Sequence, residues 1–256
     1  MTAKSRRHLL TIVAAIAIVA SSCGSDGDSA ETTAAPATEA PATAPAETTP
    51  AETSPPVTEA PATFEGELVG VFEITEGACD GATVSGSYFR MIQTGGTAEG
   101  PFVPNADSPC VADQSYSLLA PGTDGGLASG THQPAPDPAF DAVGNATAAA
   151  IAQPAVFFGV AFAVATDEAA DAPALSAAGG VLSGQVAAFT AYYGGAPFNQ
   201  GSPKPDGSKP GLTADVVGTI DPVTGAFVLE WSSQIVGGPF DSFTGVWHFE
   251  GTFVPA

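Results

Sequence analysis

Two segments near the C-terminus alternate large apolar residues with polar ones, and this pattern restricts the fold more than any other feature of the chain. Side chains of a β-strand point to opposite faces in turn, so residues 226–236 and 243–253 each predict a strand with one apolar face. The residues of these apolar faces are Phe227, Leu229, Trp231, Ile235, Phe243, Trp247, Phe249 and Phe253. We expect them, both tryptophans included, to pack in the core of a β domain.

The preceding segment completes a hairpin. Residues 216–221 are a further strand candidate, and residues 221–225 contain the Asp, Pro and Gly that are typical of a tight turn. The chain has 30 Gly and 23 Pro, a composition that favours many short strands joined by turns. We therefore expect a mostly all-β fold, a sandwich or barrel-like domain of antiparallel strands.

One short helix is expected within this domain, at residues 141–153 (DAVGNATAAAIAQ). The segment is rich in Ala, Asp141 or Asn145 can cap its first turn, and Pro154 ends it. A helix this short is stable only when it packs on the sheet.

A pattern also recurs within the domain. Residues 70–102 run GVFEI, VSGSYFRMIQTGG and GPF, residues 159–198 run GVAFAV, LSGQVAAFTAYYGG and APF, and GGPF stands again at 237–240. Each instance predicts a strand that leaves into a glycine turn, with the following Phe folded back as a plug. Duplication within a β-sandwich and chance in a Gly-rich chain are both open explanations.

The composition changes sharply near residue 64. Residues 24–63 contain no aromatic residue, no Leu and no Ile, so they cannot bury enough apolar surface to offset the entropy of ordering the chain. We expect a disordered Ala/Thr/Pro/Glu-rich stalk over 23–63, which its prolines make an extended spacer. Residues 64–256, about 190 in number, suit a single folded domain.

The N-terminal residues have the features of an export signal. A basic segment precedes the apolar run LLTIVAAIAIVA at 9–20, which is shorter than the roughly 20 residues of a membrane-spanning helix. The basic residues are Lys4, Arg6 and Arg7. Small residues then lead directly to Cys23, and this order resembles the lipobox of bacterial lipoproteins, although that family prefers Leu or Val at the position of Ala20.

The lipobox resemblance implies an address. Residues 1–22 would be removed, Cys23 would carry lipid, and the protein would be held on the extracytoplasmic face of the cell membrane. An ordinary secretory signal cut near Ala20 is the alternative.

Two cysteines remain in the folded region, Cys79 and Cys110. An even number in an exported domain predicts a structural disulfide. A metal pair or a reactive thiol is the alternative, but neither cysteine has a His or Cys neighbour at ligand spacing.

The charge of the processed chain restricts its partners. Removal of residues 1–22 leaves three basic residues against 27 acidic ones, a net charge near −24. Such a surface repels phosphate backbones, so no nucleic-acid partner is expected. The acidic surface serves either solubility or the binding of cations.

Recognisable catalytic chemistry is absent from the sequence. No GxSxG, HExxH, CxxC, Walker or dinucleotide motif is present. His248 and Glu250 fall on one face of a predicted strand, where they could share a metal or a proton or simply face solvent. We therefore predict no catalytic residue, no metal site and no cofactor.

Three polar loops carry several Asp and Asn residues, at 104–110, 121–126 and 197–211. Oxygen-rich loops with glycine hinges can wrap a calcium ion. The same residues form ordinary turns, so both readings remain open.

Residues 198–207 (FNQGSPKPDG) together with 243–253 resemble a domain of uncharacterised exported bacterial proteins, and this resemblance implies no activity. We expect a non-catalytic surface module that binds a cell-wall polymer, a small ligand or a protein. Such a module predicts a concave patch lined by an exposed Tyr192 or Tyr193. An acid-pair hydrolase, with two carboxylates in a cleft, and a purely structural surface protein are the alternatives.

Overall fold

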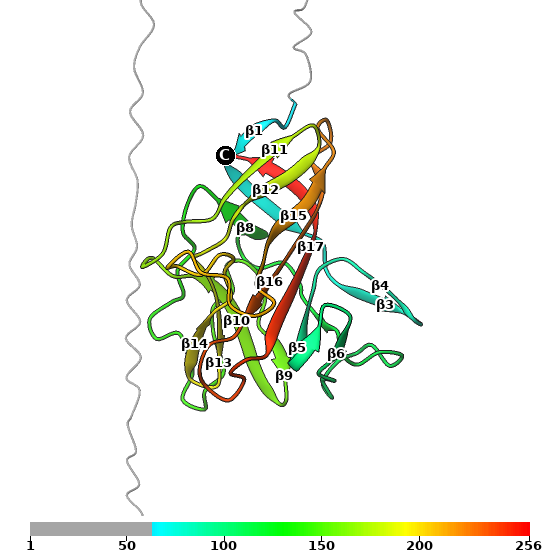
Figure 1. Cartoon of the computed structure of the whole chain (residues 1–256), viewed down its shortest axis with the longest axis vertical. Helices are drawn as coiled ribbons and strands as arrows, with labels where there is room; N and C mark the ends of the chain where they lie inside the picture. Colours follow the sequence, from blue (N-terminus) through cyan, green and yellow to red (C-terminus); the bar gives the residue numbers. More distant parts are fainter. Residues whose placement is uncertain (1–62) are drawn as a thin grey trace, which may run out of the picture. The chain divides into compact units, whose positions relative to one another are not determined.

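The computed structural model describes residues 63–256, and it is an all-β structure of antiparallel strands (Figure 1). The expected signal segment, Cys23 and the stalk up to residue 62 lie outside the described residues. Within residues 63–256 no helix is long and apolar enough to cross a membrane. The strands are β1 (Gly66–Leu68), β2 (Gly70–Ile74), β3 (Ala78–Asp80), β4 (Thr83–Ser85), β5 (Tyr88–Thr97), β6 (Gly100–Phe102), β7 (Ser117–Leu118), β8 (Gly126–Ser129), β9 (Ala155–Phe157), β10 (Val160–Thr166), β11 (Ala174–Ala178), β12 (Val181–Gln185), β13 (Phe189–Tyr193), β14 (Ala196–Asn199), β15 (Ala214–Ile220), β16 (Ala226–Gln234) and β17 (Thr244–Pro255).

The largest sheet curls until it nearly closes into a barrel. Its main path runs β1-β11-β12-β15-β16-β17-β2-β8, with each neighbouring pair antiparallel. Only Val69 separates β1, the first strand of this path, from β2, the last but one. The sheet thus returns to its first strand, which removes most of its free edges. The expectation of a barrel-like antiparallel domain is confirmed.

The longest strand, β17, joins several parts of the structure. It pairs with β16 on one side, and on the other side first with β5 and then with β2. Strand β5 in turn pairs with β6 and β7. A second sheet, in the order β14-β13-β10-β9, shares one hydrophobic core with the barrel sheet.

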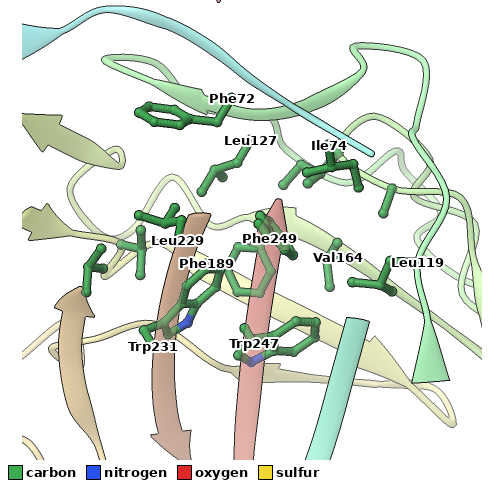
Figure 2. Packing of buried hydrophobic residues seen from close by; sticks show 14 of the residues in the cluster. Phe72, Ile74, Leu119, Leu127, Val164, Phe189, Leu229, Trp231, Trp247 and Phe249 are labelled. Atoms are coloured by element: carbon green, nitrogen blue, oxygen red, sulfur yellow. The ribbon is translucent and has the colours of Figure 1, made fainter. Parts of the chain in front are cut away.

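The inner faces predicted for the C-terminal strands are confirmed. Figure 2 shows Trp231 and Trp247 beside Phe189 and Phe249 in the core. The two indole rings are stacked with centroids 6.1 Å apart, and the ring of Phe189 meets each of them edge-on at 4.9 Å. Of the predicted apolar faces only Phe243 is half-buried, because it stands one residue before β17 begins.

The hairpin predicted at residues 221–225 is also confirmed. The carboxylate of Asp221 accepts hydrogen bonds from the amides of Val223 and Thr224, at 2.9 and 2.7 Å, and so closes the turn between β15 and β16. Gly225 adopts a φ of 74°, a conformation that glycine reaches without strain.

The helix expected at residues 141–153 is wrong. The Asp141 carboxylate caps a turn instead of a helix, accepting from the amides of Val143 and Asn145 at 2.9 Å each. The carbonyls of residues 149–151 accept hydrogen bonds from the amides of residues 122–124. Because a neighbouring loop uses these carbonyls, they are not available for the bonds of a helix.

The repeated sequence pattern does not produce repeated strand pairing. In the first instance β2 and β5 both pair with β17, whereas in the second β10 pairs directly with β13. Only the hairpins β5–β6 and β13–β14 correspond. The structure therefore contains no duplicated unit beyond a hairpin.

Candidate functional site

Cys79 and Cys110 form a disulfide with their Cα atoms 5.5 Å apart. The bond joins strand β3 to the long loop before β7, and Cys110 is buried. It agrees with the structural disulfide expected from the sequence, and a disulfide suggests an oxidising, extracytoplasmic compartment.

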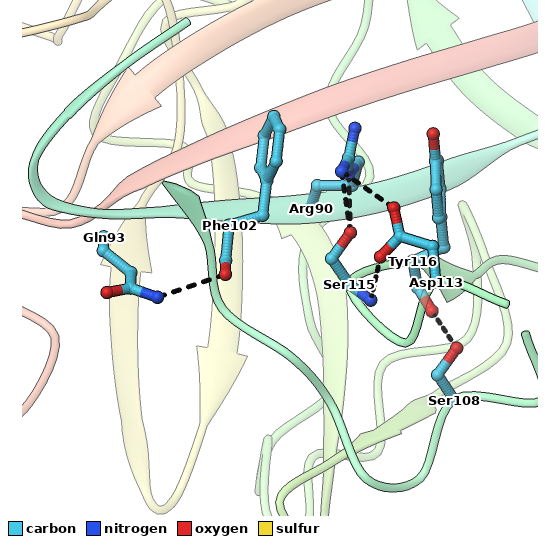
Figure 3. Close-up of polar contacts among 7 residues, drawn as sticks. All are labelled: Arg90, Gln93, Phe102, Ser108, Asp113, Ser115 and Tyr116. Atoms are coloured by element: carbon cyan, nitrogen blue, oxygen red, sulfur yellow. Dashed lines mark hydrogen bonds and ion pairs between the residues drawn. The ribbon is translucent and has the colours of Figure 1, made fainter. Parts of the chain in front are cut away.

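Arg90 also holds this loop, through the contacts with Asp113 and Ser115 drawn in Figure 3. Its guanidinium lies over the rings of Phe102 and Tyr116, 3.4 and 4.2 Å from their centroids, and donates to Ser115 and Asp113. Stacking together with charge-assisted hydrogen bonds fixes a guanidinium strongly. The side chain therefore positions the loop, and its charge is compensated by Asp113.

His248 lies on the outer face of the barrel sheet and is held by its neighbours. Its Nδ1 is 2.7 Å from a carboxylate oxygen of Glu230, its Nε2 is 3.9 Å from Glu250, and its ring stacks on Tyr88. The Glu250 carboxylate also accepts from the amide of Gly86 at 3.0 Å. Residues 63–256 contain no group of three or more His, Cys, Asp and Glu side chains placed to hold a metal.

The three oxygen-rich loops do not come together in one site. Asp107 accepts from the amide of Gly159 at 2.7 Å, Asp124 from the side chain of Gln133 at 3.0 Å, and Asp206 from the amide of its own turn. Asp206 thus closes its own turn, whereas Asp107 and Asp124 bond to residues 52 and 9 positions away along the chain.

A buried lysine was not anticipated from the sequence. The ammonium of Lys204 donates to the Asn199 carbonyl at 2.8 Å and to the Ser233 hydroxyl at 2.6 Å. Burial lowers the pKa of Lys204 to about 8, against the opposing effect of Asp206. A serine beside a lysine of lowered pKa resembles an activated nucleophile, but Ser233 is fully buried and its hydroxyl donates to the Gly201 carbonyl. The pair therefore anchors the 200–209 loop.

An apolar cavity lies between the barrel sheet and the second sheet. It has a volume of about 40 Å³, and the surface exposed to it is entirely apolar. The lining residues come from both sheets and from two connecting segments: Phe89, Met91, Phe157, Phe162, Ala191, Tyr193, Phe198, Gln200, Ile235, Phe240 and Trp247.

The few polar groups around this cavity bond to one another. The Tyr193 hydroxyl donates to the Phe157 carbonyl at 3.1 Å. The Trp247 indole donates to the Gln200 side-chain oxygen at 3.3 Å, and the Gln200 amide nitrogen donates to the Asn199 carbonyl at 3.1 Å. An occupant would therefore be held by contact and shape alone.

A glycine-containing loop, residues 236–243, closes one side of the cavity. The ring of Phe240 packs against Phe157 and Tyr193, with centroids 6.0 and 5.7 Å apart. Gly238 lies so close to Phe198 that an added Cβ would stand 2.6 Å from its ring. The predicted plug is thus present at the GGPF segment, with Phe240 folded back over the apolar interior.

No protein-family model, curated protein or solved structure matches this chain. Any function of the cavity therefore has to follow from the residues that line it.

Both tyrosines named for a binding patch are half-buried. Tyr193 lines this cavity, whereas Tyr192 packs against Phe140 in a separate cluster. No carboxylate lines the cavity, so it lacks the acid pair of a hydrolase. Phe157 and Phe162 were not singled out from the sequence, where they read only as part of apolar strands.

Proposed function

We propose that this protein is a membrane-anchored extracytoplasmic lipoprotein whose β domain is a non-catalytic binding module for a small apolar ligand. The observation that carries the proposal is the entirely apolar cavity that Phe240 covers. A pocket without free hydrogen-bonding groups suits neither a cell-wall polysaccharide nor a polar substrate. Of a cell-wall polymer, a small ligand and a protein, it favours a small ligand, and one that is apolar.

The described conformation is a closed one. A cavity that binds benzene in other proteins measures about 150 Å³. The present cavity, about 40 Å³, is too small for such a ring until Phe240 moves. Movement is feasible because the backbone hydrogen bonds of residues 237–243 join only residues of the segment 235–243. Binding therefore replaces the Phe240 ring with the ligand.

Tryptophan fluorescence tests the binding proposal, because Trp247 lines the cavity. The probe is dodecyl maltoside with bromine atoms on its chain, which quench a tryptophan on contact, used below its micelle concentration. We expect saturable quenching with one site per protein. The variant Ala191→Leu fills the cavity and should weaken binding by about tenfold or more, while the exposed Ala178→Leu serves as matched control. Equal binding by both variants would remove the cavity as the site.

The anchoring proposal has its own test. The wild-type protein should begin at Cys23 and partition into detergent, because two or more acyl chains anchor stably. The Cys23→Ser protein should be released or should retain its first 22 residues. Normal processing and membrane attachment of that variant would refute the lipoprotein assignment.

A further inference from the structure

A single buried side chain holds the outer edge of strand β9. The strand pairs with β10 along one edge, and Asn105, from the loop that precedes β7, bonds to it from the other. The Asn105 side-chain nitrogen donates to the Val156 carbonyl at 2.9 Å, and its side-chain oxygen accepts from the amide of Phe158 at 3.4 Å. In extended chain the carbonyl of one residue and the amide two positions on point to the same side, so Asn105 bonds this stretch as a neighbouring strand would.

The residue between these two bonds is Phe157, which lines the cavity. Phe157 is buried, and its ring meets the ring of Phe240, which closes the cavity, with centroids 6.0 Å apart. Asn105 is buried as well, but it does not line the cavity. It therefore fixes the backbone on both sides of a wall residue without touching an occupant.

The backbone after Phe157 is held under strain. Phe158 has a φ of 49°, a left-handed conformation that large side chains rarely adopt. Such strain persists only where the surroundings impose it, and here two side chains of one loop do so. Asn105 accepts from the amide of Phe158, and the Asp107 carboxylate accepts from the amide of Gly159 at 2.7 Å. Without these bonds the turn would relax, and Phe157 would no longer be fixed in the wall.

The loop that carries Asn105 is itself fastened at several points. The side-chain nitrogen of Asn105 also donates to the Ser117 hydroxyl at 3.1 Å. Ser108, whose hydroxyl bond to Tyr116 is drawn in Figure 3, accepts from the amide of Cys110 at 3.2 Å. Cys110 is in turn bonded to β3 through the disulfide. These bonds give Asn105 a fixed base from which to hold β9.

From these contacts we propose that Asn105 is a positioning residue of the cavity: it holds Phe157 in the wall, and the affinity for an apolar ligand depends on it. This inference rests on the proposed function, since it names what controls the same cavity. A wall that is fixed before binding does not have to be ordered by the ligand, so a residue out of contact with the ligand can set the affinity.

A matched pair of alanine variants tests the effect on binding. Gln133 is also buried and bonds strand β8 in the same way, because its side chain donates to the Gly126 carbonyl and accepts from the amide of Ala128. Neither Gln133 nor these two partners line the cavity. Gln133→Ala therefore removes an equivalent buried amide at a distance from the site.

Binding of the brominated dodecyl maltoside is compared in the two variants and the wild type. We expect Asn105→Ala to bind the probe at least about fivefold more weakly than the wild type, and Gln133→Ala to bind it as the wild type does. Unchanged or tighter binding by Asn105→Ala, or an equal loss in both variants, would overturn the inference and leave the proposed function standing. If the wild type itself does not bind, the proposed function fails.

A double-mutant cycle with Phe158→Gly tests the positioning without any ligand. Glycine adopts a positive φ without strain, so Phe158→Gly removes the strain that Asn105 offsets. Asn105→Ala should therefore lower the melting temperature in the Phe158→Gly background by no more than about half as much as in the wild-type background. Equal losses in the two backgrounds would show that Asn105 does not impose this turn and would overturn the inference. If Asn105→Ala does not fold, Asn105→Ser takes its place in both experiments, because serine is too short to bond both Val156 and Phe158.

Discussion

In the proposed binding mode, entry of the ligand depends on opening of the 236–243 loop, and a pair of glycine substitutions tests this step. Gly237 and Gly238 both have positive φ, 81° and 70°. An added Cβ at Gly237 meets nothing within 4 Å, whereas at Gly238 it would stand 2.6 Å from the Phe198 ring. The two Gly→Ala variants therefore share the same backbone strain, and only Gly238→Ala adds a clash in the closed conformation.

The contacts of Phe240 set the scale of the effect. Burial of a Phe side chain stabilises by about 1.5–3 kcal/mol, and Phe240 is only partly buried against Phe157 and Tyr193. A free-energy difference of this size between the closed and open loop leaves an open population of about 0.1–10%. Left-handed backbone costs an alanine about 1–2 kcal/mol, which both variants incur. Crowding against Phe198 adds about 1–3 kcal/mol for Gly238→Ala alone.

The difference between the variants translates into a rate. If Gly238→Ala destabilises the closed state by about 1.4 kcal/mol more than Gly237→Ala does, its open population is about tenfold larger. Stopped-flow quenching of Trp247 by the brominated probe should therefore show about tenfold faster association for Gly238→Ala. Equal association rates in the two variants would show that the loop does not control access to the cavity. Circular dichroism of both proteins checks that the fold is retained.

Three further predictions concern the core, the disulfide and the buried lysine. Trp247→Ala should lower the free energy of unfolding, measured in urea, by about 3–5 kcal/mol. The indole is buried, and its loss leaves the side-chain oxygen of Gln200 without a donor. A loss below about 1 kcal/mol would contradict the place of Trp247 in the core. Peptide mapping without reductant should recover Cys79 linked to Cys110, and two thiols that alkylate freely would refute the bond. The pKa of Lys204 is lowered to about 8 in the folded state, so above that pH the unfolded state binds one more proton than the folded state. The free energy of unfolding of the wild type should therefore rise relative to that of Lys204→Met between about pH 8 and 10. A difference that stays constant over this range would refute the lowered pKa.

The sequence predicted those parts of the fold in which large side chains alternate. Residues 227, 229 and 231, and again 247, 249 and 253, could hardly be left in water, so their inner face followed from period two alone. The helix at 141–153 failed because its Ala residues have high helix propensity but little surface to bury. The carbonyls of residues 149–151 instead accept hydrogen bonds from the amides of residues 122–124. Local helix propensity does not contain this long-range pairing.

The cavity could be predicted only in part for a related reason. Phe89, Phe157, Phe162 and Trp247 line it from β5, β9, β10 and β17, which are far apart in sequence. Local pattern shows that each side chain points inward, but not which of them leave a gap between two sheets. The GGPF motif was the exception, since two glycines before Pro-Phe marked Phe240 as a residue that folds back.

The placement of the cavity within the domain bears on the proposed tethering. Strand β1, by which the described chain enters the domain, and the C-terminus lie at one end, whereas β9, β13 and β14 lie toward the opposite end (Figure 1). The second sheet and the closing loop supply most of the cavity's aromatic residues, and the barrel sheet adds Phe89 and Trp247. If Cys23 is anchored as proposed, tension on the N-terminal side is borne by β1, which pairs with β11 in the barrel wall. The closing loop then bears none of this tension, because neither β1 nor the C-terminal strand β17 belongs to it.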